Sequence, residues 1–134
     1  MEKEALKRIF EFLEEKGEHN APLVWKLIND IPITEKDLDF EGDLILTYSD
    51  IESLPEGLNV RGDLDLFGSK LASLPEGLKV RGYLDLRYSS IESLPKGLKV
   101  RDLHIWDTSL TKYTDEELRE MIKPGFIKGK IYRI

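Results

Sequence analysis

A 20-residue period runs through the middle of this chain and constrains its fold more than any other feature. Residues 51–70 read IESLPEGLNVRGDLDLFGSK, residues 71–90 read LASLPEGLKVRGYLDLRYSS, and a third copy starts at residue 91 and closes one residue early. Residues 31–50 keep the same apolar phase but lack the SLPEG segment, which is typical of a terminal repeat. One such repeat cannot bury a core alone, so we expect the copies to stack into a solenoid.

Each repeat predicts one short strand and an irregular return segment. Polar and apolar residues alternate in Gly62–Leu66, so Leu64 and Leu66 are expected to face the interior beneath a parallel sheet. Pro75 and Gly77 do not suit a regular helix, which predicts an extended or 3₁₀ return. We expect a buried column of hydroxyl side chains to hydrogen-bond the backbone of the turn that follows each strand; its members are Ser49, Ser69, Ser89 and Thr108.

Both ends of the repeat region predict caps. Apolar residues at helical spacing around Leu6–Leu13 and Leu23–Ile28 predict a helical cap over residues 1–30, with Trp25 in its core. At the other end, Thr114 and Glu117 form a capping-box pattern for a helix, and residues 126–134 predict a final strand. We interpret the chain as one domain, with the N-terminal cap at 1–30, four repeats at 31–110, the first of them degenerate, and the C-terminal cap at 111–134.

The repeat also resembles a known family. Its pattern, L-x-L-x-x-S-x-[IL]-x-x-L-P-x-x-L-x-V, is similar to the short class of bacterial leucine-rich repeats, in which Asn usually takes the hydroxyl position. The tract GDLDL…SLPEGLKVRG, followed by TDEELREMIKPGFIKGKIY, resembles small leucine-rich-repeat proteins of phages and prophages. The resemblance implies an α+β repeat fold: a leucine-rich-repeat solenoid with short parallel β-strands, a helical N-terminal cap and a helix/strand C-terminal cap. It implies no activity, because the effector proteins of this class add a catalytic cysteine domain and this chain has no cysteine.

Charge and composition narrow the class of partner. The net charge is −6, which argues against nucleic acids and anionic membranes and favours a protein partner with a basic or mixed-charge surface. The chain has no cysteine, no apolar run of membrane-spanning length and no signal-peptide pattern at its start, so we expect a cytoplasmic protein. Two histidines without cysteine give no metal-site spacing, and we expect no metal or cofactor.

Equivalent positions of successive repeats should line up as columns on the exposed face of the sheet. The predicted columns are Glu41, Arg61, Arg81 and Arg101; Asp43, Asp63 and Tyr83; Ile45, Asp65, Asp85 and His104; Thr47, Phe67, Arg87 and Trp106; and, at the strand exit, Tyr48, Gly68, Tyr88 and Asp107. We interpret the arginine and aspartate columns as a solvated surface in which opposite charges balance. Phe67, Arg87 and Trp106 instead have the composition of a protein-binding hot spot, unless a loop or cap covers them.

Three functions are open at this point. We predict a non-enzymatic protein–protein interaction module whose partner-binding residues are Phe67, Arg87, Trp106, Tyr48, Tyr83, Tyr88, Asp65, Asp85 and His104. The phage resemblance implies that the partner is a host protein, for example a defence factor that this chain inhibits. The first alternative is a hydrolase that uses a carboxylate–imidazole pair of Asp85 and His104, which requires a concave pocket around His104. The second alternative is a structural or self-associating scaffold.

Overall fold

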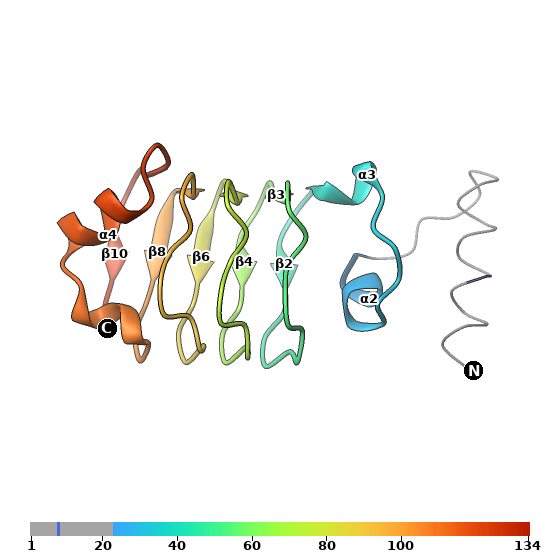
Figure 1. Ribbon diagram of the computed structural model, residues 1–134, viewed down its shortest axis with the longest axis horizontal. Coiled ribbons are helices and arrows are strands. Elements are labelled where there is room, and N and C mark those ends of the chain that lie inside the picture. The colour runs from blue at the N-terminus through green and yellow to red at the C-terminus, as the bar shows by residue number, and fades with distance from the viewer. Residues whose placement is uncertain (1–7, 9–22) are drawn as a thin grey trace.

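The computed structural model describes residue 8 and residues 23–134, and this part of the chain forms a parallel-strand β-solenoid with few helices (Figure 1). Successive turns lie side by side along one axis, and strand residues 20 positions apart pair with each other, as Leu44 does with Leu64. The predicted solenoid of short parallel strands is confirmed. The predicted helix around Leu6–Leu13 lies outside the described residues, apart from Arg8. Within the described part, no helix has the length and apolar character needed to cross a bilayer.

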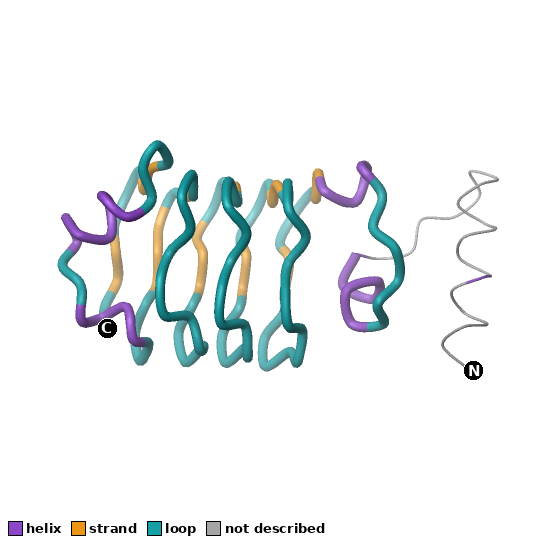
Figure 2. Tube along the Cα trace, in the orientation of Figure 1, coloured by secondary structure: helices purple, strands orange, loops and turns teal. Residues whose placement is uncertain are grey.

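Two parallel sheets run along the solenoid, where the sequence predicted one (Figure 2). The first sheet contains, in order, β1 (Asp39–Phe40), β3 (Asn59–Val60), β5 (Lys79–Val80), β7 (Lys99–Val100) and β9 (Phe126–Ile127). The second contains β2 (Leu44–Ile45), β4 (Leu64–Asp65), β6 (Tyr83–Asp85), β8 (Asp102–His104) and β10 (Ile131–Tyr132). The sequence predicted the second sheet and missed the first, because two residues such as Lys79–Val80 are too few to show alternation.

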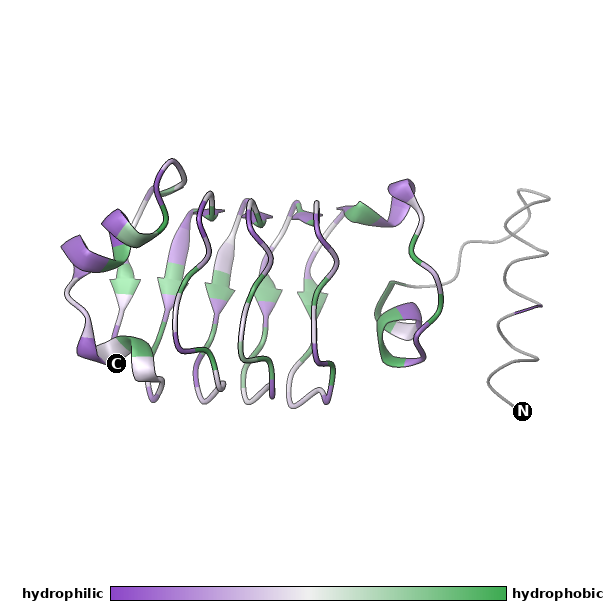
Figure 3. Ribbon diagram, in the orientation of Figure 1, coloured by the Kyte–Doolittle hydropathy of each residue, from purple (hydrophilic) through white to green (hydrophobic). Residues whose placement is uncertain are grey.

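The core is a stack of aliphatic side chains enclosed by the two sheets and the return segments. Each turn contributes the same buried set; in the turn of residues 64–80 these are Leu64, Leu66, Leu71, Leu74, Leu78 and Val80. Figure 3 shows hydrophobic stretches recurring at equivalent places in successive turns. Gly57, Gly77 and Gly97 all have φ between +74° and +83°, so the SLPEG segment carries its glycine where the return segment bends back toward the first sheet.

Two short helices precede the first turn of the solenoid. The predicted helix at Leu23–Ile28 is confirmed as α2, whereas α3 (Glu35–Leu38), which begins at a capping box of Thr34 and Asp37, was not predicted. Lys26 is buried, and its Nζ donates a hydrogen bond to Asp37 Oδ2 at 2.8 Å, which ties the two helices together. Ile28 was expected on the apolar face of its helix but is 58% exposed.

The C-terminal segment covers the other end. After a 3₁₀ helix at Ser109–Lys112, α4 (Asp115–Met121) begins at the predicted capping box, in which Thr114 and Glu117 exchange hydrogen bonds of 3.0 and 3.1 Å. The chain then forms both β9 and β10, so it extends both sheets instead of adding the single predicted strand. The Arg119 side chain donates hydrogen bonds to the carbonyl oxygens of Ile127 and Gly129, which holds α4 against this last turn.

Candidate partner-binding face

The outer face of the second sheet carries the columns that the sequence predicted. Ile45 pairs with Asp65, Asp65 with Asp85, and Asp85 with His104. Tyr132 of β10 pairs with His104 and adds a further member, which sequence reasoning missed because residues 126–134 lie outside the repeat. Backbone hydrogen bonds between successive turns fix the neighbouring columns in the same register, as between Gly68 N and Arg87 O at 2.9 Å.

Four aromatic side chains form a continuous row on this face, the aromatic stripe of Tyr48, Phe67, Tyr88 and Trp106. Neighbouring ring centroids lie 5.5, 5.1 and 6.1 Å apart, in the edge-to-face or tilted geometry that aromatic pairs prefer. Tyr48, Tyr88 and Trp106 are 70%, 49% and 39% exposed, and Phe67 is half-buried between its neighbours. In the part of the chain that the structure describes, no loop or cap therefore covers Tyr48, Tyr88 or Trp106.

The backbone beneath the stripe adopts a conformation that tyrosine rarely takes. Tyr48, Tyr88 and Asp107 have φ of +56°, +58° and +55°, and Gly68 has +67° at the equivalent place in its turn. The left-handed conformation costs a non-glycine residue about 1–2 kcal/mol. Gly68 shows that the turn also accepts glycine at this place. A Cβ added to Gly68 would lie only 2.6 Å from ring atoms of Tyr48. Two tyrosines in this conformation therefore suggest a function for the stripe, since such strain is concentrated at functional sites.

Arg87 is held against the stripe by Asp85. Its Nε and Nη2 donate to the two carboxylate oxygens of Asp85 at 2.9 and 2.7 Å, and its backbone N–H donates to Asp85 Oδ1 at 3.0 Å. The guanidinium carbon lies 5.1 Å from the centre of the Phe67 ring. Hydrogen bonding to Asp85 raises the pKa of Arg87, which therefore stays charged. Asp85 was expected to contact the partner, but it is only 3% exposed and instead positions Arg87.

The predicted carboxylate–imidazole pair does not form. Asp85 and His104 are neighbours in register, yet both Asp85 oxygens accept from Arg87 and no hydrogen bond among the described residues joins Asp85 to His104. His104 instead stacks on Tyr132, with centroids 4.6 Å apart and ring planes at 17°, and meets Tyr83 edge-on at 5.4 Å. Burial, followed by the nearby Asp63 and Asp65 carboxylates, raises the pKa of Tyr83.

The aspartate column next to this face has a structural role. Asp43 Oδ1 accepts a hydrogen bond from the backbone N–H of Asp63 at 2.7 Å, and Asp63 Oδ1 accepts one from Tyr83 N at 2.8 Å. In the last turns, Asp102 Oδ1 accepts one from Lys130 N at 2.9 Å. These carboxylates therefore cap the backbone of the following turn, a role that the sequence did not predict, and Asp102 also balances the charge of Arg101 at 2.9 Å.

The predicted hydroxyl column is buried except at Ser49, which is half-buried, and it bonds the backbone at Thr108 only. Thr108 Oγ1 donates to Ile105 O at 2.6 Å and accepts from Leu110 N at 3.2 Å. The Oγ atoms of Ser49, Ser69 and Ser89 have no hydrogen-bond partner. The expectation is thus confirmed at Thr108 and wrong at the three serines, a difference that hydroxyl reach does not explain, because the oxygen is bonded to Cβ in both residue types.

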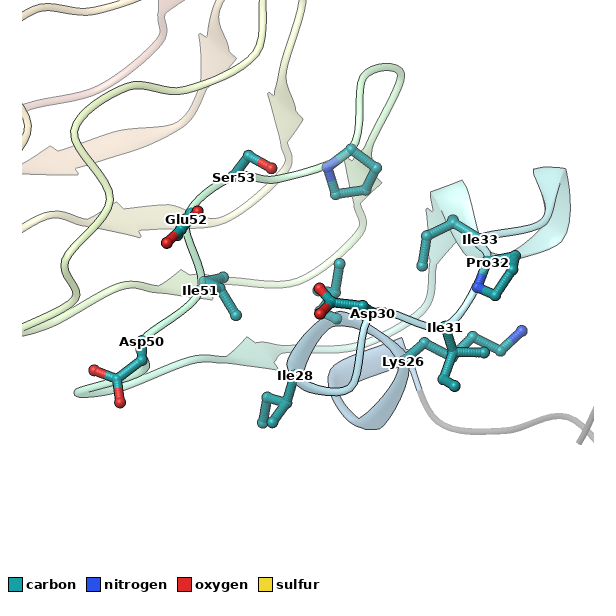
Figure 4. A pocket seen from close by; sticks show the side chains of 12 residues that line it. Lys26, Ile28, Asp30, Ile31, Pro32, Ile33, Asp50, Ile51, Glu52 and Ser53 are labelled. Atoms are coloured by element: carbon teal, nitrogen blue, oxygen red, sulfur yellow. The ribbon is translucent and has the colours of Figure 1, made fainter. Parts of the chain in front are cut away.

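A hollow lies away from the stripe, between α2 with its following loop and the first return segment (Figure 4). It encloses about 640 Å³, and Asp30, Asp50 and Glu52 place carboxylates on its lining. Neither this hollow nor a smaller one of about 330 Å³ on the first sheet is lined by His104, so the concave pocket that a hydrolase would need there is missing from the described hollows. No group of three or more His, Asp or Glu in the described ranges is arranged to hold a metal ion.

Comparison of the chain with models of protein families, with curated proteins and with solved structures gives no match. The function of this face is therefore inferred from its geometry, an exposed row of aromatic rings with Arg87 fixed over the Phe67 ring.

Proposed function

We propose that this protein is a non-enzymatic interaction module that binds another protein through the aromatic stripe and Arg87. The observation that carries the proposal is the exposure of Tyr48, Tyr88 and Trp106 in one row, with Arg87 clamped beside them by Asp85. Trp, Tyr and Arg are the residue types that dominate the binding energy of protein interfaces. A contiguous row of such side chains exposed to water on a protein surface is typical of an interaction site.

The side chains of the face are held in place before any partner arrives. Phe67 contacts both tyrosines of the stripe and the Arg87 guanidinium, so these groups lose little further freedom on binding. Immobilising a flexible side chain at an interface costs about 0.5–1.5 kcal/mol, and a row that is already ordered avoids much of this cost. The arrangement therefore supports specific binding better than four separately mobile aromatic residues would.

The chemistry around the stripe favours a partner with a basic or mixed-charge surface. Asp65 is half-buried next to the stripe, its Oδ1 accepting from Phe67 N, and Asp107 lies at the end of the row beside Tyr88. The more specific proposal is that the partner is a host protein, such as a cytoplasmic defence factor, which this chain inhibits. That proposal is supported only by the resemblance of the repeats to leucine-rich-repeat proteins of phages and prophages.

The test is to capture partners from a bacterial lysate with the protein immobilised, and then to measure the affinity of each purified partner. Trp106→Ala and Tyr48→Ala remove exposed rings at the two ends of the stripe without opening the core. We expect at least one of them to weaken binding about 30-fold, the effect of removing a hot-spot residue. Isothermal titration calorimetry measures the change.

Phe126→Ala is the matched control, since it also removes a partly exposed aromatic ring but on the first sheet. The proposal fails if the stripe variants bind the captured protein as tightly as the wild type, or if Phe126→Ala weakens binding equally. Capture of the chain itself would favour the self-associating scaffold instead, and light scattering would detect that outcome as an oligomer.

A further inference from the structure

The outer face of the first sheet carries a second charged surface, opposite in sign to the aspartates of the second sheet. A hollow of about 330 Å³ lies over β5, β7 and β9. Besides Val80 and Val100, its lining consists of five cations and one aromatic ring, and we call it the basic hollow: Lys79, Arg81, Lys99, Arg101, Lys128 and Phe126. The sequence did not predict this surface, because it assigned no strand to Lys79 or Lys99 and treated residues 126–134 separately.

Within the described part of the chain, four of these cations form no ion pair, although Arg81 contributes after Arg61 to lowering the pKa of the Asp39 carboxyl. Among the ion pairs of the described residues, none involves Lys79, Arg81, Lys99 or Lys128, whereas Arg101 pairs with Asp102 at 2.9 Å. Lys79 and Lys99 are directly paired in register on neighbouring strands, about 4.8 Å apart. Like charges placed opposite each other across strands repel and destabilise the sheet.

The same columns are balanced at the other end of the solenoid, which gives an internal comparison. Arg61 occupies the position equivalent to Arg81, and it pairs with Asp39 at 2.6 Å and with Glu41 at 3.8 Å. Asn59, a neutral residue, takes the position of Lys79 and pairs with it in register. Positive charge therefore accumulates only toward the C-terminal turns, where a bound anion would relieve the repulsion.

Phe126 adds a second and independent feature to the hollow. It pairs with Lys99 in register, its ring is 42% exposed, and Lys128 Nζ lies 5.6 Å from the ring centroid. A ring surrounded by cations offers stacking for a base together with charge for phosphates, the combination used by proteins that bind single-stranded nucleic acids. An acidic peptide would use the cations but would leave the exposed ring without a stacking partner.

We propose that the basic hollow binds a single-stranded nucleic acid, with phosphates over Lys79, Lys99 and their neighbours and one base stacked on Phe126. Three neighbouring strands span about 10 Å, which suits two or three phosphates of one strand. The net charge of −6 opposes binding at long range, but charges further away than about 8 Å are largely screened at physiological salt. This site lies on a different sheet from the aromatic stripe and does not depend on the proposed protein partner.

The experiment measures the fluorescence anisotropy of a labelled oligothymidylate of roughly 12 nucleotides, a length within the usual site sizes. Lys79→Glu/Lys99→Glu reverses two cations of the hollow, and Lys70→Glu/Lys123→Glu changes the net charge equally on the exposed surface elsewhere. We expect the first pair to weaken binding at least about tenfold and the control pair to change it much less, because contacts in the hollow dominate. Circular dichroism verifies that each variant is folded, and Lys79→Gln/Lys99→Gln replaces the glutamate pair if that pair unfolds.

Two further readouts separate the contributions of phosphate and base. For a single strand, the slope of log K against log salt scales as about 0.7 per phosphate contact, so Lys79→Gln/Lys99→Gln should reduce its magnitude by about 1.4. Phe126→Leu should weaken binding about tenfold and leave that slope unchanged, because stacking carries no counterion release. The proposal is overturned if the wild type does not bind, or if Lys70→Glu/Lys123→Glu loses as much affinity as Lys79→Glu/Lys99→Glu. It is also overturned if a duplex of equal length or polyglutamate competes as well as the single strand.

Discussion

Three aspartates cap the backbone of the following turn, and each of them needs a glycine opposite its carboxylate. A Cβ added to that glycine would collide with the aspartate Oδ1; the pairs are Asp43 with Gly62, Asp63 with Gly82, and Asp102 with Gly129. The repeat of residues 71–90 has Tyr83 in place of the aspartate, and the turn that follows reads Arg101-Asp102, without the glycine. The two departures from the repeat are therefore physically coupled, because the carboxylate is what a Cβ at this place would meet first; at Gly82 the backbone oxygen of Gly62 comes next, at 2.9 Å.

This coupling can be measured in a double-mutant cycle at Asp63 and Gly82. We expect Gly82→Ala to lower the free energy of unfolding by about 2–3 kcal/mol, the cost of inserting an atom into a packed site. Asp63→Ala should cost about 1 kcal/mol for its lost hydrogen bond to Tyr83 N. In the double variant the collision with the carboxylate is absent, so the combined cost should be smaller than the sum by roughly 1 kcal/mol or more. Urea denaturation gives all four values, and additive costs would show that the glycine is required for another reason.

The elements that close the two ends of the solenoid are fixed by side chains, since none of them shares the repeat. At the first end, buried Lys26 joins α2 to Asp37 of α3. At the second end, Arg133 donates to Asp115 Oδ1 at 2.7 Å and to the carbonyl oxygen of Tyr113 at 2.8 Å, which ties the end of the chain to the start of α4. Stacked repeats need such ends, because their core would otherwise be open to water.

The Lys26–Asp37 contact predicts how stability depends on pH. Burial would raise the pKa of the Asp37 carboxyl, but the hydrogen bonds from Lys26 and Thr34 outweigh it and lower the pKa below the ordinary 3.8. A carboxyl whose pKa is lower in the folded state stabilises the fold above pH 3.8, and this contribution is lost as the pH falls through the folded value. Asp37→Asn should therefore lower the free energy of unfolding at neutral pH by about 2 kcal/mol, less than for a fully buried pair because Asp37 is partly exposed.

Thermal unfolding of the wild type and Asp37→Asn across the acidic range measures this dependence. The difference between the two proteins should be constant well above pH 3.8 and should shrink below it, where the wild-type carboxyl is protonated as well. Glu35→Gln serves as the control, because it removes an exposed carboxylate of the same helix. A difference that stays constant down to strongly acidic pH would mean that Asp37 acts through its shape and not through its charge.

At the scale of the whole molecule, the solenoid presents two surfaces of different chemistry on its two sheets. The aromatic stripe and Arg87 lie on the outer face of the second sheet, and the basic hollow lies on the first. Parallel pairing repeats each position every 20 residues, so one substitution per repeat is enough to build a row along the axis. Such a stack can therefore carry separate binding sites that change independently of each other.

The two proposed sites should respond separately to substitution. We expect Trp106→Ala to leave the affinity for oligothymidylate within about twofold of the wild type, because surface changes away from a site usually alter energies by less than about 0.5 kcal/mol. Lys79→Gln/Lys99→Gln should likewise leave the affinity for the protein partner unchanged. Anisotropy and calorimetry on the same set of variants check both statements. Loss of both activities in either variant would indicate one shared surface or a loss of folding.

The sequence alone determined the repeat, the residues that face the core and the register of the columns on the second sheet. These features follow from local patterns, because alternation in Gly62–Leu66 sets which side chains point inward, and an identical period in each copy forces equivalent positions to align. The capping box at Thr114 and the outward position of Phe67 and Trp106 in one column were predictable for the same reason. The partner of the stripe is a prediction that these patterns motivate.

Only the tertiary structure decided how the side chains of neighbouring turns meet. It showed that Asp85 holds Arg87 and does not bond His104, that the aspartate column caps the backbone, and that the first sheet gathers Lys79, Lys99 and Phe126 into one hollow. Some of these contacts join residues about 20 positions apart. Others join neighbouring side chains that have several hydrogen-bond partners within reach. Which partner a side chain contacts depends on the close packing of the backbone from turn to turn and on the direction of each short strand. The period of the sequence specifies neither of these.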